Sequence, residues 1–153
     1  MADFRFRAAA ALELRRQQET AAATDLARDE ALLRAAEMRV AEAETQRHTS
    51  QDQQQAAERR GTDAGTLAWH RNWITRLAAV VDTLKAECDT QAQVVRQAEQ
   101  RWRDARRKRL ALERMRDRTW RRYQQEQQRQ ELKIIDELAR LRFVVSVSAR
   151  DEG

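Results

Sequence analysis

The sequence predicts an all-α protein, an antiparallel two-helix coiled-coil hairpin whose longer second helix overhangs the N-terminus. The chain has 153 residues and no proline, and glycine occurs only at positions 61, 65 and 153. Alanine, arginine, glutamate, glutamine and leucine dominate, and all of them favour helix. Apolar residues recur every seven positions in two rows, which is typical of a coiled-coil seam. So few turn-forming and β-branched residues exclude sandwiches and barrels.

The first helix is expected from about residue 7 to residue 60. Two rows of apolar residues spaced by sevens form its seam. The rows comprise Leu12, Leu26, Leu33 and Val40, and Ala8, Ala22, Ala36 and Ala43. Polar residues interrupt them at Arg15, Glu19 and Asp29. An alanine row allows close approach of a second helix, so bulkier residues on that helix can fill the space.

Residues 61–65 form the one plausible turn, because both internal glycines fall there. A short connection makes the two helices antiparallel neighbours. The second helix is expected from about residue 66 to residue 143, and residues 144–153 are expected to form a frayed tail.

The second helix carries a matching seam, again as two rows spaced by sevens. The rows comprise Ile74, Val81, Cys88, Val95 and Trp102, and Leu77, Leu84, Ala98, Ala105 and Leu112. Gln91 interrupts the second row. Cys88 is therefore interpreted as a small core residue.

The two predicted helices differ in length. With the turn centred on Asp63, residue 7 lies opposite about residue 119, so residues 120–143 project without a partner. This overhang begins with a polar run, residues 124–131, and then regains an apolar stripe at Ile134, Leu138 and Leu141. An apolar stripe that the chain does not cover predicts a partner protein.

The formal charge of +5 is unevenly distributed. Residues 101–122 contain eleven Lys or Arg against three Asp or Glu, a local net charge of +8. We call this segment the basic collar. A solvated helix surface is one interpretation, and a surface for an acidic protein partner is the other. Nucleic acid is disfavoured, because no recognition module accompanies the charge.

Trp69 and Trp73 lie near the turn, towards the flank of the seam. Two indoles beside the end of a thin hairpin cannot both be fully buried, and tryptophan is a favoured interface anchor. We therefore expect a binding surface at the hairpin end.

No catalytic, cofactor or metal site is expected. Glycine-rich phosphate loops are absent, the single cysteine excludes a multi-cysteine metal site, and His48 and His70 lack metal-ligand spacing. No apolar run approaches the roughly 18 residues of a membrane span. These patterns favour a cytoplasmic, non-enzymatic protein without a small-molecule substrate.

Several segments of the chain resemble the FliJ family of flagellar export proteins. The resemblance rests on helical patterns at residues 4–7, 102–104, 110–113, 116–118 and 133–139. It implies an antiparallel coiled coil similar to the central stalk of rotary ATP synthases. It also implies a soluble component of the flagellar type III export apparatus, located at the inner face of the cell membrane and associated with that membrane only indirectly.

The resemblance implies two main partners. The terminal end would insert into a hexameric export ATPase, and the hairpin end would contact the cytoplasmic domain of the membrane export gate, linking ATP hydrolysis to export. An escort role for export chaperones also follows. The ATPase-binding residues are predicted to be Arg103, Arg107, Arg114, Arg118, Arg122, Tyr123, Ile134 and Leu138. The family's gate-contacting face maps onto Trp73, Leu77, Val80 and Leu84, to which we add Trp69.

Two alternatives stay open at this point. The equivalent stalk of a virulence injectisome shares the hairpin and differs in its partners. A basic coiled-coil protein that binds nucleic acid is the other alternative, and its binding would fall steeply with salt.

Overall fold

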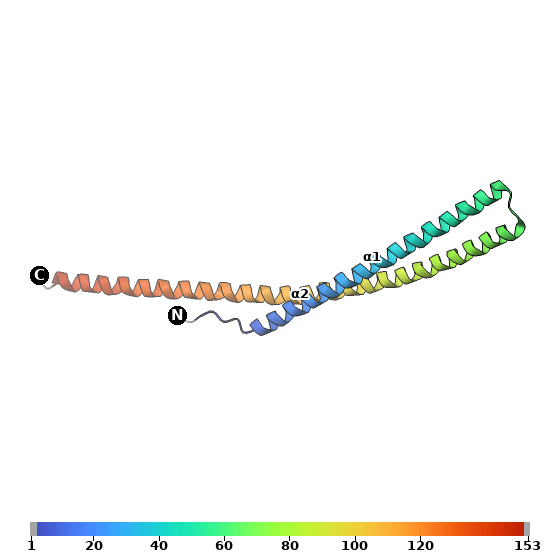
Figure 1. Ribbon diagram of the computed structural model, residues 1–153. Helices are drawn as coiled ribbons and strands as arrows, with labels where there is room; N and C mark the ends of the chain where they lie inside the picture. Colours follow the sequence, from blue (N-terminus) through green and yellow to red (C-terminus); the bar gives the residue numbers. More distant parts are fainter. Residues whose placement is uncertain (1–2, 152–153) are drawn as a thin grey trace. The chain divides into compact units, whose positions relative to one another are not determined.

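The computed structural model describes residues 3–151, and these form two long helices, α1 (Ala9–Arg60) and α2 (Ala64–Asp151). Among the described residues there is no strand, and the two helices pack against each other as an antiparallel hairpin (Figure 1). The predicted all-α hairpin is confirmed. The chain divides into two compact units, one of Gln17–Arg106 and one of Met1–Arg16 with Arg107–Gly153. Each unit is described in turn.

The unit Gln17–Arg106 contains the turn, which is shorter than the predicted residues 61–65. Gly61 ends α1 with a φ of 75°, a left-handed conformation that strains a residue with a Cβ. Asp63 then caps α2: its Oδ2 accepts a hydrogen bond from the Thr66 N–H at 3.3 Å, and its Oδ1 accepts one from the Thr66 hydroxyl at 2.6 Å. With Asp63 as the cap, Gly65 already belongs to the first turn of α2.

The seam of this unit follows the predicted rows. Within this unit the buried residues of α1 fall on the alanine row, with Ala36 at 4% and Ala43 at 8% exposure. On α2, Val81 is fully buried and Leu77 is 5% exposed. Small residues on one helix thus meet larger aliphatic residues on the other, as the sequence predicts. The alanine row continues by sevens through two further buried positions, Ser50 and Ala57.

The polar interruptions of the two helices meet each other. Asp29 is buried, and the Gln91 Nε2 donates a hydrogen bond to the Asp29 main-chain oxygen at 3.0 Å. The Asp29 carboxylate forms an ion pair within its own helix: Arg28 Nε lies 3.5 Å from Asp29 Oδ1. Asp29 and Gln91 therefore form a polar layer that stays in register with the apolar seam.

Ion pairs between the helices confirm their antiparallel course. Lys85 Nζ lies 2.7 Å from Glu44 Oε1, and Arg39 lies 4.0 Å from Glu87. The hydrogen bond from Lys85, together with its charge, lowers the pKa of Glu44. Both pairs are largely solvent-exposed, so they define register more than they add stability.

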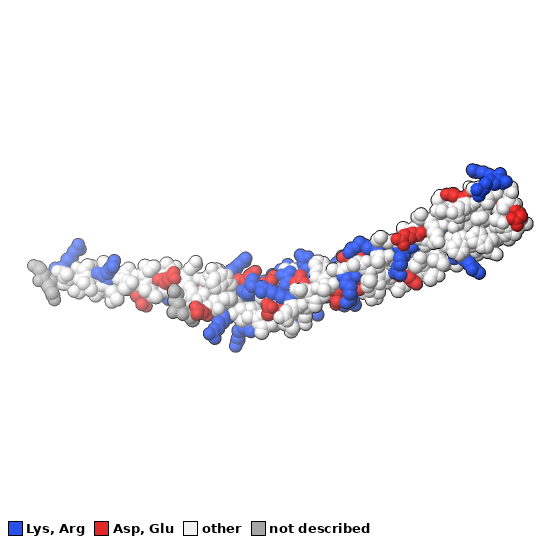
Figure 2. All heavy atoms as spheres, viewed as in Figure 1, with Lys and Arg blue, Asp and Glu red and all other residues white. Residues whose placement is uncertain are grey.

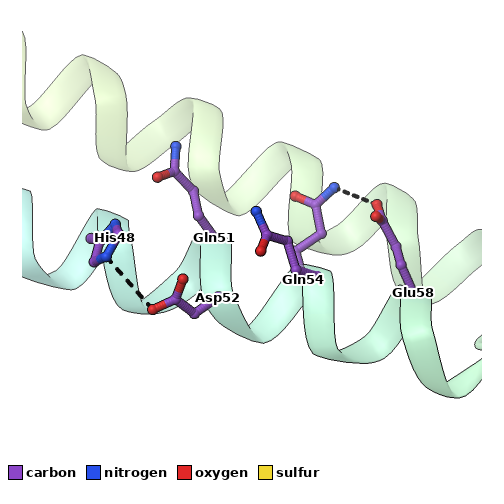
Figure 3. A pocket seen from close by; sticks show the side chains of 6 residues that line it. His48, Gln51, Asp52, Gln54 and Glu58 are labelled. Atoms are coloured by element: carbon purple, nitrogen blue, oxygen red, sulfur yellow. Dashed lines mark hydrogen bonds and ion pairs between the residues drawn. The ribbon is translucent and has the colours of Figure 1, made fainter.

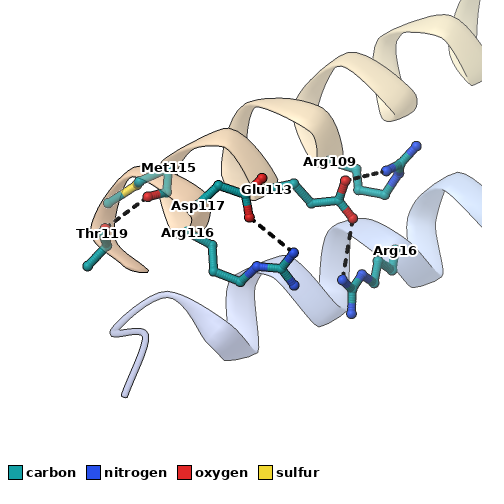
Figure 4. A network of polar contacts seen from close by, with 7 residues as sticks. All are labelled: Arg16, Arg109, Glu113, Met115, Arg116, Asp117 and Thr119. Atoms are coloured by element: carbon teal, nitrogen blue, oxygen red, sulfur yellow. Dashed lines mark hydrogen bonds and ion pairs between the residues drawn. The ribbon is translucent and has the colours of Figure 1, made fainter. Parts of the chain in front are cut away.

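The second unit pairs the N-terminal residues with the middle of α2. Helix α1 begins at Ala9, and residues 3–8 before it are not helical. Arg16 on α1 and Arg109 on α2 both reach Glu113, at 3.3 and 2.7 Å (Figure 4). Nearer the N-terminus, the Phe4 ring centroid lies 4.9 Å from that of Trp120. Residue 7 therefore lies near the level of residue 119, as expected.

Beyond this paired region α2 continues as an overhang. Every side chain from residue 128 to residue 150 is exposed. The overhang begins later than the predicted residue 120, because the Phe4 ring contacts Trp120 and Tyr123. Residues 144–151 are helical and not the predicted frayed tail, while residues 152 and 153 of that tail lie outside the described residues.

Candidate partner-binding surfaces

Arginines line one flank of α2 in the second unit. Arg107, Arg114, Arg118 and Arg122 are all exposed, and their spacing places them within roughly 80° around the helix. Among residues 3–151 no ion pair engages Arg114, Arg118 or Arg122. These three guanidinium groups can therefore meet carboxylates of a partner without first breaking a bond within the chain.

Arg103, the remaining predicted ATPase-binding arginine, belongs to the other unit. Its side chain is exposed, but its Nη2 lies 2.7 Å from Glu99 Oε1. The neighbouring Arg106 lies over the Trp102 ring at 5.4 Å from the centroid. On the face shown in Figure 2, basic and acidic side chains alternate along the paired helices. Arg103 thus has a local ion-pair partner that Arg114 lacks.

Tyr123 is half-buried in an aromatic cluster, not part of the free overhang. Its ring is stacked on Trp120 at 5.5 Å and lies 5.5 Å from Phe4. Trp120 keeps 41% of its surface exposed, so a partner that contacts this cluster would meet the Trp120 indole beside Phe4. The heptad rows do not predict this cluster; its signal in the sequence is the alternation of residues 4–7, two phenylalanines separated by an arginine.

The apolar stripe of the overhang is fully available. Ile134 is 57%, Leu138 55% and Leu141 62% exposed, and Ile135 at 58% widens the stripe. A shallow hollow of about 440 Å³ lies over Ile135, Leu138, Ala139 and Arg142. This hollow therefore combines three apolar side chains with the guanidinium group of Arg142.

The stripe does not continue the hairpin seam. The seam rows of α2 run by sevens to Thr119 and Tyr123, and they continue through Glu126 and Gln130 to Lys133, Glu137 and Arg140. The stripe residues Ile134, Leu138 and Leu141 each follow one of these polar residues by a single position. One residue corresponds to about 100° around an α-helix. The overhang therefore presents its apolar side about a quarter-turn away from the side that α1 would cover.

At the hairpin end, two of the predicted gate-binding residues form a stacked pair. Trp69 is 60% and Trp73 36% exposed, and their rings are nearly parallel at 6.3 Å. Val80 is 47% exposed farther along α2. Leu77, at 5% exposure, belongs to the seam, and Leu84 is half-buried there. The exposed part of this surface therefore consists of Trp69, Trp73 and Val80, whereas Leu77 lies in the seam beneath it.

Basic groups accompany the stacked pair. A hollow of about 150 Å³ is lined by Trp69, Asn72, Trp73 and Arg76. No Asp or Glu occurs between Asp63 and Asp82, whereas Arg71 and Arg76 lie in this stretch. The surface can hold an apolar side chain with a carboxylate beside it. His70 is half-buried at a seam position and touches Trp69 edge-on.

A third hollow lies on α1 and is entirely polar in character. It has a volume of about 400 Å³ and is lined by His48, Gln51, Asp52, Gln54, Gln55 and Glu58 (Figure 3). His48 Nε2 lies 3.7 Å from Asp52 Oδ2, and the Gln54 amide donates to Glu58 at 2.9 Å. Among residues 3–151, no three or more His, Cys, Asp or Glu side chains are grouped so as to hold a metal ion. Within the same part of the chain, no helix is long and apolar enough to cross a membrane.

Comparison with known proteins identifies the family. The family described as Flagellar FliJ protein matches residues 9–148, which include nearly all of α1 and α2. Comparisons with curated proteins and with solved structures give no significant match. The matched range covers well over half of the chain, and we conclude that this chain belongs to the FliJ family of flagellar export proteins.

Proposed function

We propose that the chain is a non-enzymatic stalk that connects the hexameric flagellar export ATPase to the cytoplasmic domain of the export gate. The overhang and the basic collar would bind the ATPase, and the hairpin end would bind the gate. In this role the chain acts in the cytoplasm at the base of the flagellum and couples ATP hydrolysis to protein export. Family membership supports a function in flagellar export, and the two surfaces support these particular partners.

The observation that carries the proposal is the exposed apolar stripe on the overhang. Nothing in the described chain covers it, and it is turned away from the side where α1 packs. An apolar stripe of this length on an isolated helix is costly in water, so a protein partner is its natural cover. The unpaired arginines nearby add a charge preference for an acidic surface.

The stripe supplies a test with a matched control. We expect Ile134→Ser with Leu138→Ser to weaken binding to the cognate export ATPase hexamer by about tenfold or more, because both substitutions remove apolar area that the partner would bury from water. Lys133→Ser with Arg140→Ser alters the side of the same turns that continues the seam rows, and it should change affinity less than threefold. Isothermal titration calorimetry measures both. Equal effects of the two double variants would contradict binding through the stripe.

The arginines on the α2 flank give a second variant for the same assay. Charge reversal at Arg114, Arg118 and Arg122 should abolish detectable binding at moderate salt, because it places three carboxylates against an acidic surface. Unchanged binding would contradict a role for these arginines.

The hairpin end requires its own experiment. We expect Trp69→Ala with Trp73→Ala to lower affinity for the cytoplasmic gate domain about thirtyfold or more, since exposed indoles are frequent hot spots. Folding should be retained, because both side chains lie outside the buried seam. The same variant should bind the ATPase normally. Wild-type affinity for the gate would contradict the assignment.

A further inference from the structure

The non-helical segment before α1 lies against α2 with alternating sides. Phe4 and Phe6 are half-buried, whereas Arg5 and Arg7 are exposed. Residues 3–6 have no regular secondary structure, and residues 7 and 8 form the turn into α1, in which the Ala9 N–H donates a hydrogen bond to the Phe6 main-chain oxygen at 3.1 Å. The segment therefore directs its phenylalanines towards the protein and its arginines towards solvent.

Phe4 fixes the segment at a defined level of α2. Its ring centroid lies 4.9 Å from Trp120 in an edge-to-face contact and 5.5 Å from Tyr123. Trp120 and Tyr123 lie on the same turns of α2 as the exposed arginines Arg118 and Arg122. Arg5 and Arg7 are thus held at the same level as the end of the basic collar.

The stability of the chain does not explain these two arginines. Helix α1 begins at Ala9 and has no acidic residue in its first turn. A positive charge just before a helix N-terminus opposes the helix dipole, where Asp or Glu would be favourable. Among residues 3–151 neither Arg5 nor Arg7 forms an ion pair that would compensate for this arrangement.

We propose that residues 4–7 form a second basic segment of the ATPase-binding surface. In it Phe4 holds the segment on α2, while Arg5 and Arg7 bind carboxylates of the partner. This inference rests on the proposed function and extends it to a segment outside the family match at residues 9–148. The partner surface it fits is an acidic protein surface that contacts α2 and the N-terminal segment together.

The test is a binding titration of the full-length chain with the cognate export ATPase hexamer. Arg5→Glu with Arg7→Glu should lower affinity about tenfold or more at about 0.1 M salt. The substitution should not unfold α1, because negative charge at its N-terminus favours the helix dipole. Arg34→Glu with Arg96→Glu makes the same charge change at two exposed mid-helix positions, and we expect its affinity to stay within threefold of wild type.

The outcomes separate this inference from the proposed function. If the Arg5→Glu/Arg7→Glu variant binds with wild-type affinity while charge reversal at Arg114, Arg118 and Arg122 abolishes binding, only the role of residues 4–7 is overturned. Absence of binding by the wild-type chain would overturn the proposed function and the inference with it.

Phe4 gives an independent readout of the same idea. In a chain whose other three tryptophans are replaced by Phe, Phe4→Ala should increase acrylamide quenching of Trp120 fluorescence and lower ATPase affinity severalfold. Phe4→Tyr should preserve both, since it keeps the ring contacts. Increased quenching without any loss of affinity would overturn the role of Phe4 in positioning the arginines.

Discussion

Asp63 illustrates how a single residue defines the hairpin end. Its carboxylate accepts two hydrogen bonds from Thr66, one from the hydroxyl and one from the main-chain N–H. The hydroxyl bond is the larger cause, and together they lower the pKa of Asp63 from 3.8. The folded state therefore favours the ionised carboxylate over the protonated acid.

This pKa shift predicts a pH dependence of stability. The unfolded chain binds a proton near pH 3.8, whereas the folded chain resists protonation to lower pH. Stability from Asp63 is thus fully present above about pH 5 and is lost as the pH falls through the lowered folded pKa. We expect the thermal midpoint of the wild type to fall relative to that of Asp63→Asn as the pH is lowered from 6 to 3. Asparagine also caps helices but does not titrate, so a constant difference in circular dichroism melts would contradict this account.

Single residues were also where sequence reasoning was weakest. The exposure of Trp69 could be predicted because helical spacing places it beside the seam, and that of Ile134 because it lies beyond the level of the N-terminus. The contacts of Tyr123 could not be foreseen, because they depend on Phe4 lying in a non-helical segment before Ala9. Leu77 satisfies the seam and the gate-facing pattern at once, and only its burial decides between them.

At the scale of the helices, the seam accounts for most of what the sequence could predict. The spacing of apolar residues by seven positions predicts the buried alanines of α1 and the buried Leu77 and Val81 of α2. It could not fix the helix ends, because these depend on capping by Asp63 and on the absence of any breaker before Asp151. It also treated Asp29 and Gln91 as separate interruptions, although they are partners across the seam.

The Asp29–Gln91 layer predicts a gain in stability when it is made apolar. Burying a charged or amide group costs desolvation that its hydrogen bonds repay only in part. We expect Asp29→Leu with Gln91→Leu to raise the thermal midpoint by roughly 3–10 °C in circular dichroism melts. The control Gln91→Ala removes the hydrogen bond without adding apolar volume and should lower the midpoint. A lower midpoint for the double leucine variant would show that the polar layer stabilises the hairpin.

At the scale of the whole molecule, the absence of proline and the placement of glycine allow two uninterrupted helices. Between Ala9 and Asp151 the helices break only at residues 61–63. Helix α2 alone carries both the stacked tryptophans and the apolar stripe of the overhang. One continuous helix therefore links the proposed gate-binding and ATPase-binding surfaces, which suits a stalk that joins two partners.

The most direct measurement of this arrangement is site-specific photo-crosslinking of the full-length chain in a mixture of the export ATPase hexamer and the cytoplasmic gate domain. A photoreactive residue at Leu138 should crosslink to the ATPase, one at Trp69 should crosslink to the gate, and one at Arg140 should give little product with either. This result would establish both the polarity of the stalk and the use of the stripe side of the overhang. Crosslinks from Leu138 to the gate, or equal ATPase products from Leu138 and Arg140, would contradict the central claim.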